Sequence, residues 1–212
     1  MGIINKGILG GFSGTVGTVV GSTWKGITYM KSQPAKRSAP SSPAQLDQQA
    51  KFTTAMKYVQ SMSGLVMTSF RNYAVKMTGV NNAFSYTLKN AITGSYPNYT
   101  IDYSLSLISR GDLPNATTPS AVASASHIVT FNWTNNTGIG KAKANDKAIL
   151  AVYCPEFNQT LYTTGSAARS VGTDTLDATL FAGKQVETYI GFISEDGKDI
   201  ANSVYTGQLV VS

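Results

Sequence analysis

The chain has 212 residues and a formal net charge of +6 at pH 7, yet only 13% of its residues are charged, about half of the usual share of roughly 25%. Hydrophobic residues make up 42% of the chain, which allows a sizeable core and argues against an intrinsically disordered protein. One cysteine excludes a disulfide framework, and one histidine with one cysteine excludes most zinc sites. No apolar run approaches the ~18 residues of a membrane span.

The first element expected is a glycine-rich arm over residues 1–32. Its apolar start soon gives way to Gly, Ser and Thr, so we expect no secretion signal. The glycine spacing also fits one stripe of a helix, but glycine disfavours a helix and the β-branched residues favour a strand. An extended arm places Phe12, Val16 and Val20 on one face, and residues 22–32 continue it as a strand. We therefore predict a β hairpin or an assembly arm.

A Pro/Ser linker over residues 33–42 precedes a helical segment over residues 43–98. Ser42, Pro43 and Gln45 have the pattern of an N-cap, a first helical position and a capping box, which predicts a helix over 43–62. An apolar stripe supports it, formed by Leu46, Ala50, Phe52, Ala55, Met56, Val59 and Met62. Helical spacing then continues through Val66, Phe70, Tyr73, Met77 and Thr78, with a break at Gly79 and a short helix over 83–92 that Gly94 ends. We expect these methionines and aromatic residues to form core rather than a cofactor site.

The period of the pattern changes to two from Tyr99 onward, which predicts a β domain over residues 99–212. Seven strands are expected, over 101–107, 127–134, 147–153, 160–168, 174–180, 185–193 and 203–211. Seven short strands separated by turn signals predict an immunoglobulin-like or fibronectin-like β-sandwich. Cys154 has no partner for an inter-sheet disulfide, and Trp133 is the expected aromatic centre of the core. The fold class is thus mainly β with a helical insert.

Charge is distributed unevenly along the chain. Residues 1–100 carry ten basic side chains and one acid, Asp47, whereas residues 101–212 carry seven basic and ten acidic side chains. The basic half could bind nucleic acid through counterion release or simply form a solvated face. The basic residues are scattered, with Lys36-Arg37 the only adjacent pair, so both interpretations stay open.

The sequence offers no recognisable catalytic or cofactor chemistry. A catalytic role for His127 would need a nucleophile beside it, and the sequence has no G-x-S-x-G nucleophile elbow. Cys154 is interpreted as a buried or idle thiol. The glycines before Lys141 lack the spacing of a phosphate loop. Asp174 and Asp177 lie on a predicted strand and are expected on opposite sides.

The turn acids Glu195, Asp196 and Asp199 lack the spacing of a calcium loop. We therefore expect no catalytic, cofactor-binding or metal-binding residues. Aromatic area suited to contacts or to the core comes from Tyr86, Tyr96, Tyr99 and Tyr103.

Several blocks of the sequence resemble one family. They are Val20-Gly21-Ser22-Thr23-Trp24-Lys25-Gly26, Pro43-Ala44-Gln45-Leu46 with Ala50-Lys51-Phe52, Ser109-Arg110-Gly111-Asp112-Leu113, Phe131-Asn132-Trp133, Asp146-Lys147-Ala148-Ile149-Leu150, and Gly197-Lys198 with Ser203-Val204-Tyr205-Thr206-Gly207. Together they look like a family of uncharacterised proteins from Bacteroidota and their mobile elements, with a Gly-Ser-x-Trp-Lys-Gly motif near the N-terminus. The resemblance implies no enzyme activity, and this chain departs from it in having Gln49 in place of an expected arginine.

These features together predict a non-enzymatic protein that assembles, most plausibly a phage or phage-like virion component. We expect a homo-oligomer or a larger assembly formed through the arm, located in a virion or another assembled particle, without a membrane span. Two alternatives remain open. The first is a cell-surface or secreted module for adhesion or glycan binding, and the second is a nucleic-acid-associated protein that uses the basic half.

Overall fold

The computed structural model describes residues 2–4, 11–24, 26–35 and 40–212. The chain divides into two compact units, residues 1–42 and residues 43–212. The helices and the sheets of the larger unit thus belong to one body, whereas the N-terminal residues form a unit of their own.

The N-terminal unit is an antiparallel sheet in the order β1-β2-β3-β4, formed by β1 (Ile3–Ile4), β2 (Phe12–Val16), β3 (Val19–Trp24) and β4 (Ile27–Ser32). Gly17 lies in the two-residue turn between β2 and β3 with a φ of +57°, a region that glycine enters without steric cost. The strand expected over 22–32 is interrupted near Gly26, whose φ is +83°. The arm is therefore a small sheet of short strands, with two hairpins in place of one.

Three α-helices open the larger unit, namely α1 (Pro43–Ser61), α2 (Ser63–Ser69) and α3 (Gly79–Asn90). The helix expected over 43–62 is confirmed. The continuous helix expected through Thr78 is wrong, because α2 ends at Ser69 and a 3-10 turn follows over Arg71–Tyr73.

Gly79 begins α3 and does not end a helix as expected. A Cβ at Gly79 would lie 2.5 Å from the Val66 carbonyl oxygen, so glycine permits the close approach of α3 to α2. The Oγ1 of Thr78 caps α3 by accepting a hydrogen bond from the Asn81 N–H (3.2 Å).

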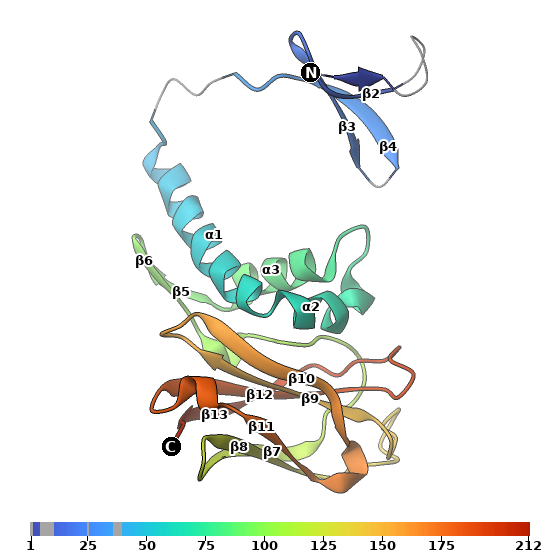
Figure 1. Ribbon diagram of the computed structural model, residues 1–212, viewed down its shortest axis with the longest axis vertical. Helices are drawn as coiled ribbons and strands as arrows, with labels where there is room; N and C mark the ends of the chain where they lie inside the picture. Colours follow the sequence, from blue (N-terminus) through green and yellow to red (C-terminus); the bar gives the residue numbers. More distant parts are fainter. Residues whose placement is uncertain (1, 5–10, 25, 36–39) are drawn as a thin grey trace. The chain divides into compact units, whose positions relative to one another are not determined.

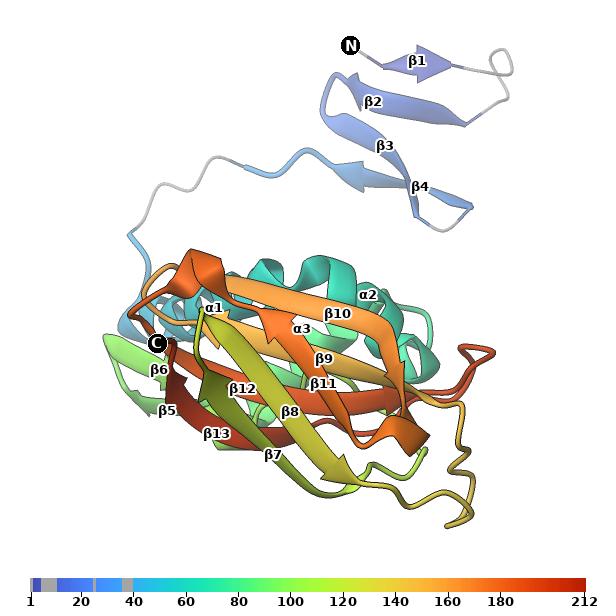
Figure 2. The same ribbon diagram turned by 60° about the horizontal axis from the view of Figure 1, so that its bottom comes forward.

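Two larger antiparallel sheets follow the helices (Figure 2). The four-stranded sheet has the order β10-β9-β12-β13, from β9 (Lys147–Cys154), β10 (Gln159–Ala168), β12 (Gln185–Ile193) and β13 (Val204–Val210). The three-stranded sheet has the order β11-β8-β7, from β7 (Thr117–Ser124), β8 (Ile128–Thr134) and β11 (Thr173–Asp177). One hydrophobic core joins the facing sides of the two sheets, with side chains such as Phe131, Trp133, Leu150 and Phe192.

β9 is buried on both faces, which explains its unbroken apolar sequence. Ala148, Leu150 and Val152 point into the core between the sheets, whereas Ile149 and Ala151 belong to a second core with the helices. That second core also contains α1 and α2 residues, including Tyr58, Val59, Met62, Leu65 and Val66. The helices therefore cover one face of the four-stranded sheet and the three-stranded sheet covers the other (Figure 1).

The strand expected over 101–107 is wrong. β6 (Asn98–Ile101) ends where Asp102 begins a 3-10 turn, because the Asp102 carboxylate accepts hydrogen bonds from the Ser104 N–H (3.0 Å) and hydroxyl (2.6 Å). β6 pairs instead with β5 (Ile92–Ser95) in a hairpin after α3.

Two further differences concern the sheets. β11 ends at Asp177, short of the expected 180, and a 3-10 turn follows. β7 was not expected at all, because its residues are small and it contains Pro119. Proline is tolerated there because β7 is an edge strand.

Candidate functional site

Large apolar side chains gather on one face of the N-terminal sheet. Trp24 lies directly opposite Ile27 in the pairing of β3 with β4, and Ser22 lies opposite Tyr29. Residues opposite each other, or two apart along a strand, share a face, so Trp24, Ile27 and Tyr29 lie together. Their exposed fractions are 55%, 68% and 41%. We call these three residues the arm face, and an exposed apolar group of this kind marks a contact surface.

The edge of the same sheet is also available for contacts. Among the described strands, β4 pairs with β3 alone, so β4 is an edge strand. An edge strand can add a strand from another chain through its backbone groups. The sequence of this unit is basic, because residues 1–42 contain five Lys or Arg and no acid. Only Lys31 of these five belongs to the described residues, and Lys36 and Arg37 lie outside them.

A buried tyrosine network joins the helices to the four-stranded sheet. The Tyr58 hydroxyl accepts a hydrogen bond from Ser106 Oγ (2.9 Å) and donates one to the Tyr189 hydroxyl (3.2 Å). The Tyr189 hydroxyl in turn donates to the Tyr103 carbonyl (2.9 Å). Burial raises the pKa of Tyr58 to about 12, and burial also raises the pKa of Tyr153, whose ring meets that of Tyr58 edge-on. These hydroxyls are neutral at pH 7 and hold the layers together.

Of the tyrosines singled out from the sequence, Tyr99 and Tyr103 line the same cleft, whereas Tyr86 and Tyr96 lie elsewhere. Tyr103 belongs to the network, and together with Tyr58, Tyr99 and Tyr153 it lines a cleft of about 220 Å³. The Tyr99 hydroxyl donates to the Asp47 carboxylate, which also pairs with Lys51. Both contacts lower the pKa of Asp47, that with Tyr99 more strongly. Tyr86 stacks on Arg110, and Tyr96 is exposed in the turn between β5 and β6.

A buried ion pair lies next to Trp133, and no motif in the sequence indicated it. Arg169 is fully buried, and its Nε donates to Asp146 Oδ2 at 3.1 Å. Its Nη1 and Nη2 donate to Asn136 Oδ1 (2.7 Å) and to the Pro114 carbonyl (2.8 Å). Burial lowers the pKa of Arg169, but the neighbouring Asp146 carboxylate opposes this effect. The guanidinium thus forms hydrogen bonds that link its own loop with two others at one end of the sheets.

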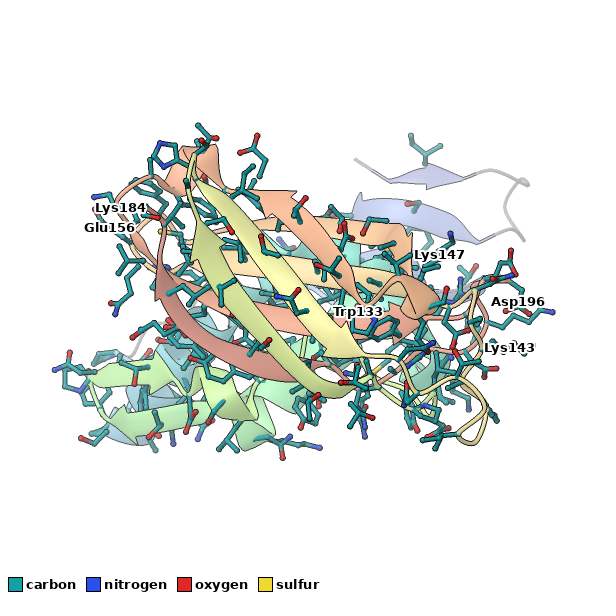
Figure 3. All side chains as sticks on the ribbon, turned by 90° about the horizontal axis from the view of Figure 1, so that it is seen from below. Trp133, Lys143, Lys147, Glu156, Lys184 and Asp196 are labelled. Atoms are coloured by element: carbon teal, nitrogen blue, oxygen red, sulfur yellow. The ribbon has the colours of Figure 1, made fainter. Side chains whose placement is uncertain are left out.

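Trp133 is a core residue, as expected. Its indole Nε1 donates to the Arg169 carbonyl (2.8 Å), and its ring lies edge-on to Phe192 with 5.4 Å between the centroids. Figure 3, a view from below, shows Trp133 toward one end of the sheets and the Lys184–Glu156 ion pair (2.6 Å) at the other end.

The residues considered for chemistry do not gather into one site. Cys154 is fully buried in the core between the sheets. His127 lies in the turn between β7 and β8 with a φ of +61°, and its N–H donates to the Ser212 carbonyl (3.0 Å). Asp174 and Asp177 accept hydrogen bonds from different hydroxyls, those of Ser166 and Thr179.

The acidic turn before β13 is organised by its own side chains. Ser194 Oγ donates to Asp196 Oδ1 (2.7 Å), and this bond is the main reason why the pKa of Asp196 is lowered to about 2. Asp199 lies 3.7 Å from Lys141. In the part of the chain that the structure describes, no three His, Cys, Asp or Glu side chains are grouped as a metal site. No described helix is long and apolar enough to span a membrane.

These observations define a mainly β protein whose helices cover one face of an antiparallel sheet. The chain belongs to a family of unknown function, DUF6266, whose model matches residues 11–207. An uncharacterised family was expected; its motif and its taxonomic range stay predictions. No curated protein matches the chain. Among solved structures it is similar to the crystal structure of the chicken CNTN1 FN1-FN3 domains, with a TM-score of 0.39 and 12% identity over 49% of this chain. The matched part spans 36% of that structure.

Proposed function

We propose that the protein is a non-enzymatic structural protein that assembles through its N-terminal sheet, as a component of a phage or phage-like virion. The observation that carries the proposal is the arm face of Trp24, Ile27 and Tyr29, exposed on a sheet that forms a compact unit of its own. Burial of such side chains contributes about 1.5–3 kcal/mol each, enough to offset the ordering of a short segment.

Charge supports a second copy of the chain as the partner. Residues 1–42 have five basic side chains and no acid, whereas residues 101–212 have ten acids and seven basic side chains. Opposite charges on the two parts favour contact between the arm of one copy and the β layers of the next. Such a head-to-tail contact extends into rings or filaments, as virion structures require.

The strand order supports an immunoglobulin-like sandwich in the larger unit. Numbered along the chain from β7 to β13, the strands form one sheet in the order 5-2-1 and one in the order 4-3-6-7. We propose that this is the arrangement of fibronectin type III modules, in which strands cross between two packed sheets. Such modules serve as building blocks and adhesive units, so a cell-surface adhesion protein is the alternative within the same class.

The arm face can be tested by mutation of one side of the sheet. The variant Trp24→Ser with Ile27→Ser removes two of its three apolar side chains. The control variant, Thr23→Ala with Thr28→Ala, changes a directly opposed pair on the other side of the same two strands. Light scattering after size exclusion should give a smaller mass for the first variant and the wild-type mass for the control. A monomeric wild type, or an unchanged mass in the first variant, overturns the proposal.

The basic half motivates a second candidate, a nucleic-acid-associated protein. Residues 1–100 carry ten basic side chains and a single acid. Binding through this half would weaken steeply with salt, and Lys36→Ser with Arg37→Ser would flatten that dependence. Titration of DNA at several salt concentrations, with wild type and variant, separates this candidate from a solvated basic face.

A further inference from the structure

One polar cavity lies on the outer side of α3 and is separate from the N-terminal sheet. Its volume is about 290 Å³, near the lower end of small-ligand pockets. One face of α3 supplies most of its lining, with Asn82, Ser85, Tyr86, Lys89 and Asn90, and Met77 and Arg110 complete it. The lining contains two cationic side chains and no acidic one.

Arg110 is held in place by its surroundings. Its guanidinium carbon lies 4.6 Å from the centre of the Tyr73 ring and 5.3 Å from that of Tyr86. Its backbone N–H donates to the Ser69 carbonyl (3.0 Å). Among the described residues no carboxylate forms an ion pair with it. The nearby Asp112 is engaged instead by the Tyr73 hydroxyl, at 2.5 Å. A stacked guanidinium of this kind is oriented to bind a planar anion.

Asn82 offers the cavity a hydrogen-bond acceptor, whereas Arg110 offers donors. Its side chain is only 7% exposed, and its Nδ2 donates to the Tyr73 carbonyl (2.5 Å), which fixes the orientation of the amide. Its Oδ1 is buried without a hydrogen-bond partner. A buried acceptor without a donor is costly, so a ligand with a hydroxyl group at this position would be favoured.

We propose that this cavity binds a uronic acid, a sugar that carries a carboxylate beside ring hydroxyls. Arg110 and Lys89 would bind the carboxylate, a sugar hydroxyl would donate to Asn82 Oδ1, and the Tyr86 ring would contact the apolar face of the sugar. A neutral sugar leaves both cations without a partner, and sulfate, which carries no proton at pH 7, leaves Asn82 without a donor. The ligand is therefore an acidic sugar residue, as in acidic polysaccharides of cell envelopes or capsules.

The test is NMR titration of the ¹⁵N-labelled full chain with D-glucuronate, D-glucose and sulfate. Glucuronate should shift the amide signals of α3 near Ser85, Lys89 and Asn90, and the other two probes should bind at least about tenfold more weakly. Equal binding of sulfate would mean that the cavity is a simple anion site and overturns the proposal. Absence of glucuronate shifts, or shifts confined to other elements, overturns it as well.

Two substitutions sharpen the test. Lys89 is exposed, so Lys89→Ala should keep the fold and weaken glucuronate binding by about tenfold. Lys57→Ala is the matched control, since Lys57 is an exposed lysine that lines the separate tyrosine cleft. Arg110→Lys keeps the charge but loses the planar fork, and it should weaken the binding of glucuronate more than the binding of sulfate. Equal effects of Lys89→Ala and Lys57→Ala, or wild-type binding in Arg110→Lys, would contradict the assignment.

Discussion

Trp133 combines two roles at one position, because its ring fills the core between the sheets while its Nε1 satisfies the Arg169 carbonyl. Trp133→Ala should therefore lower the free energy of unfolding by about 3–5 kcal/mol, the usual cost of emptying a core aromatic site. Trp133→Phe retains part of the packing and should lose less. Urea denaturation measures both values, and an unchanged melting temperature in Trp133→Ala would contradict the placement of this residue.

The ion pair of Arg169 and Asp146 is buried on both sides. Asp146→Ala leaves the guanidinium buried without its counter-charge and should destabilise the protein by about 3–5 kcal/mol. The double variant Arg169→Met with Asp146→Leu removes both charges and should recover much of that loss. Chemical denaturation of the wild type, the single variant and the double variant forms the test. A double variant less stable than Asp146→Ala would show that the pair itself stabilises the fold.

Ionisation of Tyr58 should lower the free energy of unfolding at alkaline pH. Its pKa is raised from 10.0 in the unfolded chain to about 12 in the folded protein. Above pH 10 the unfolded state loses the Tyr58 proton first, so stability is complete below pH 10 and falls as pH rises toward 12. Each pH unit in that window costs about 1.4 kcal/mol for this group.

Unfolding free energies at pH 8 to 11.5 for wild type and Tyr58→Phe test this dependence. The variant should start from a lower stability, since Ser106 loses its acceptor, but it should decline less steeply above pH 10. Parallel declines in the two proteins would mean that Tyr58 does not contribute to the pH dependence.

At the level of elements, helices and strands are predicted best where the local sequence pattern is strong. The helix over 43–62 has a start signal and an apolar stripe, and the structure has α1 over Pro43–Ser61. The strand expected over 147–153 is an apolar run after Lys147, and the strand expected over 185–193 is rich in β-branched and aromatic residues; β9 and β12 match them within a residue. In each case the pattern is long enough to outweigh alternative structures.

Prediction fails where a single side-chain contact, or packing against residues distant in sequence, decides the local structure. The alternation in residues 101–107 is that of a strand, but Asp102 turns the chain through its own side chain. Gly79 looks like a helix end until α2 is seen to pack against it. β7 is small and contains a proline, so only its pairing with β8 makes it a strand.

At the level of the whole molecule, the division at Ser42 leads to a prediction about the arm. Deletion of residues 2–32 should leave a cooperative melt, because both hydrophobic cores consist of residues beyond Tyr58 in the chain. The same deletion should abolish the oligomer, since the arm face is lost. Calorimetry and light scattering measure the two effects. A truncated protein that unfolds, or that keeps its full oligomeric mass, contradicts the role of the arm in assembly.

The candidate sites were only partly accessible to sequence reasoning. The arm was expected as an extended glycine-rich segment, although pairing was needed to show that Trp24, Ile27 and Tyr29 share a face. The cavity on α3 could not be expected, because Arg110 reaches the helix only through the packing of the chain after the β5–β6 hairpin. Asn82 was likewise unremarkable until its Oδ1 proved to be buried.

β9 and β12 are covered on both faces, and this affects how the chain folds during its synthesis. The apolar sides of α1 and α2 pack on strands that are synthesised much later, since α1 ends at Ser61 and β12 ends at Ile193. At about 5–20 residues per second, the ribosome needs roughly 7–26 s to cover that interval. During this time the helices have no sheet to cover, so the nascent chain exposes an apolar surface. We therefore expect its yield in the cell to depend on chaperones that bind the helical segment until the sheet is complete.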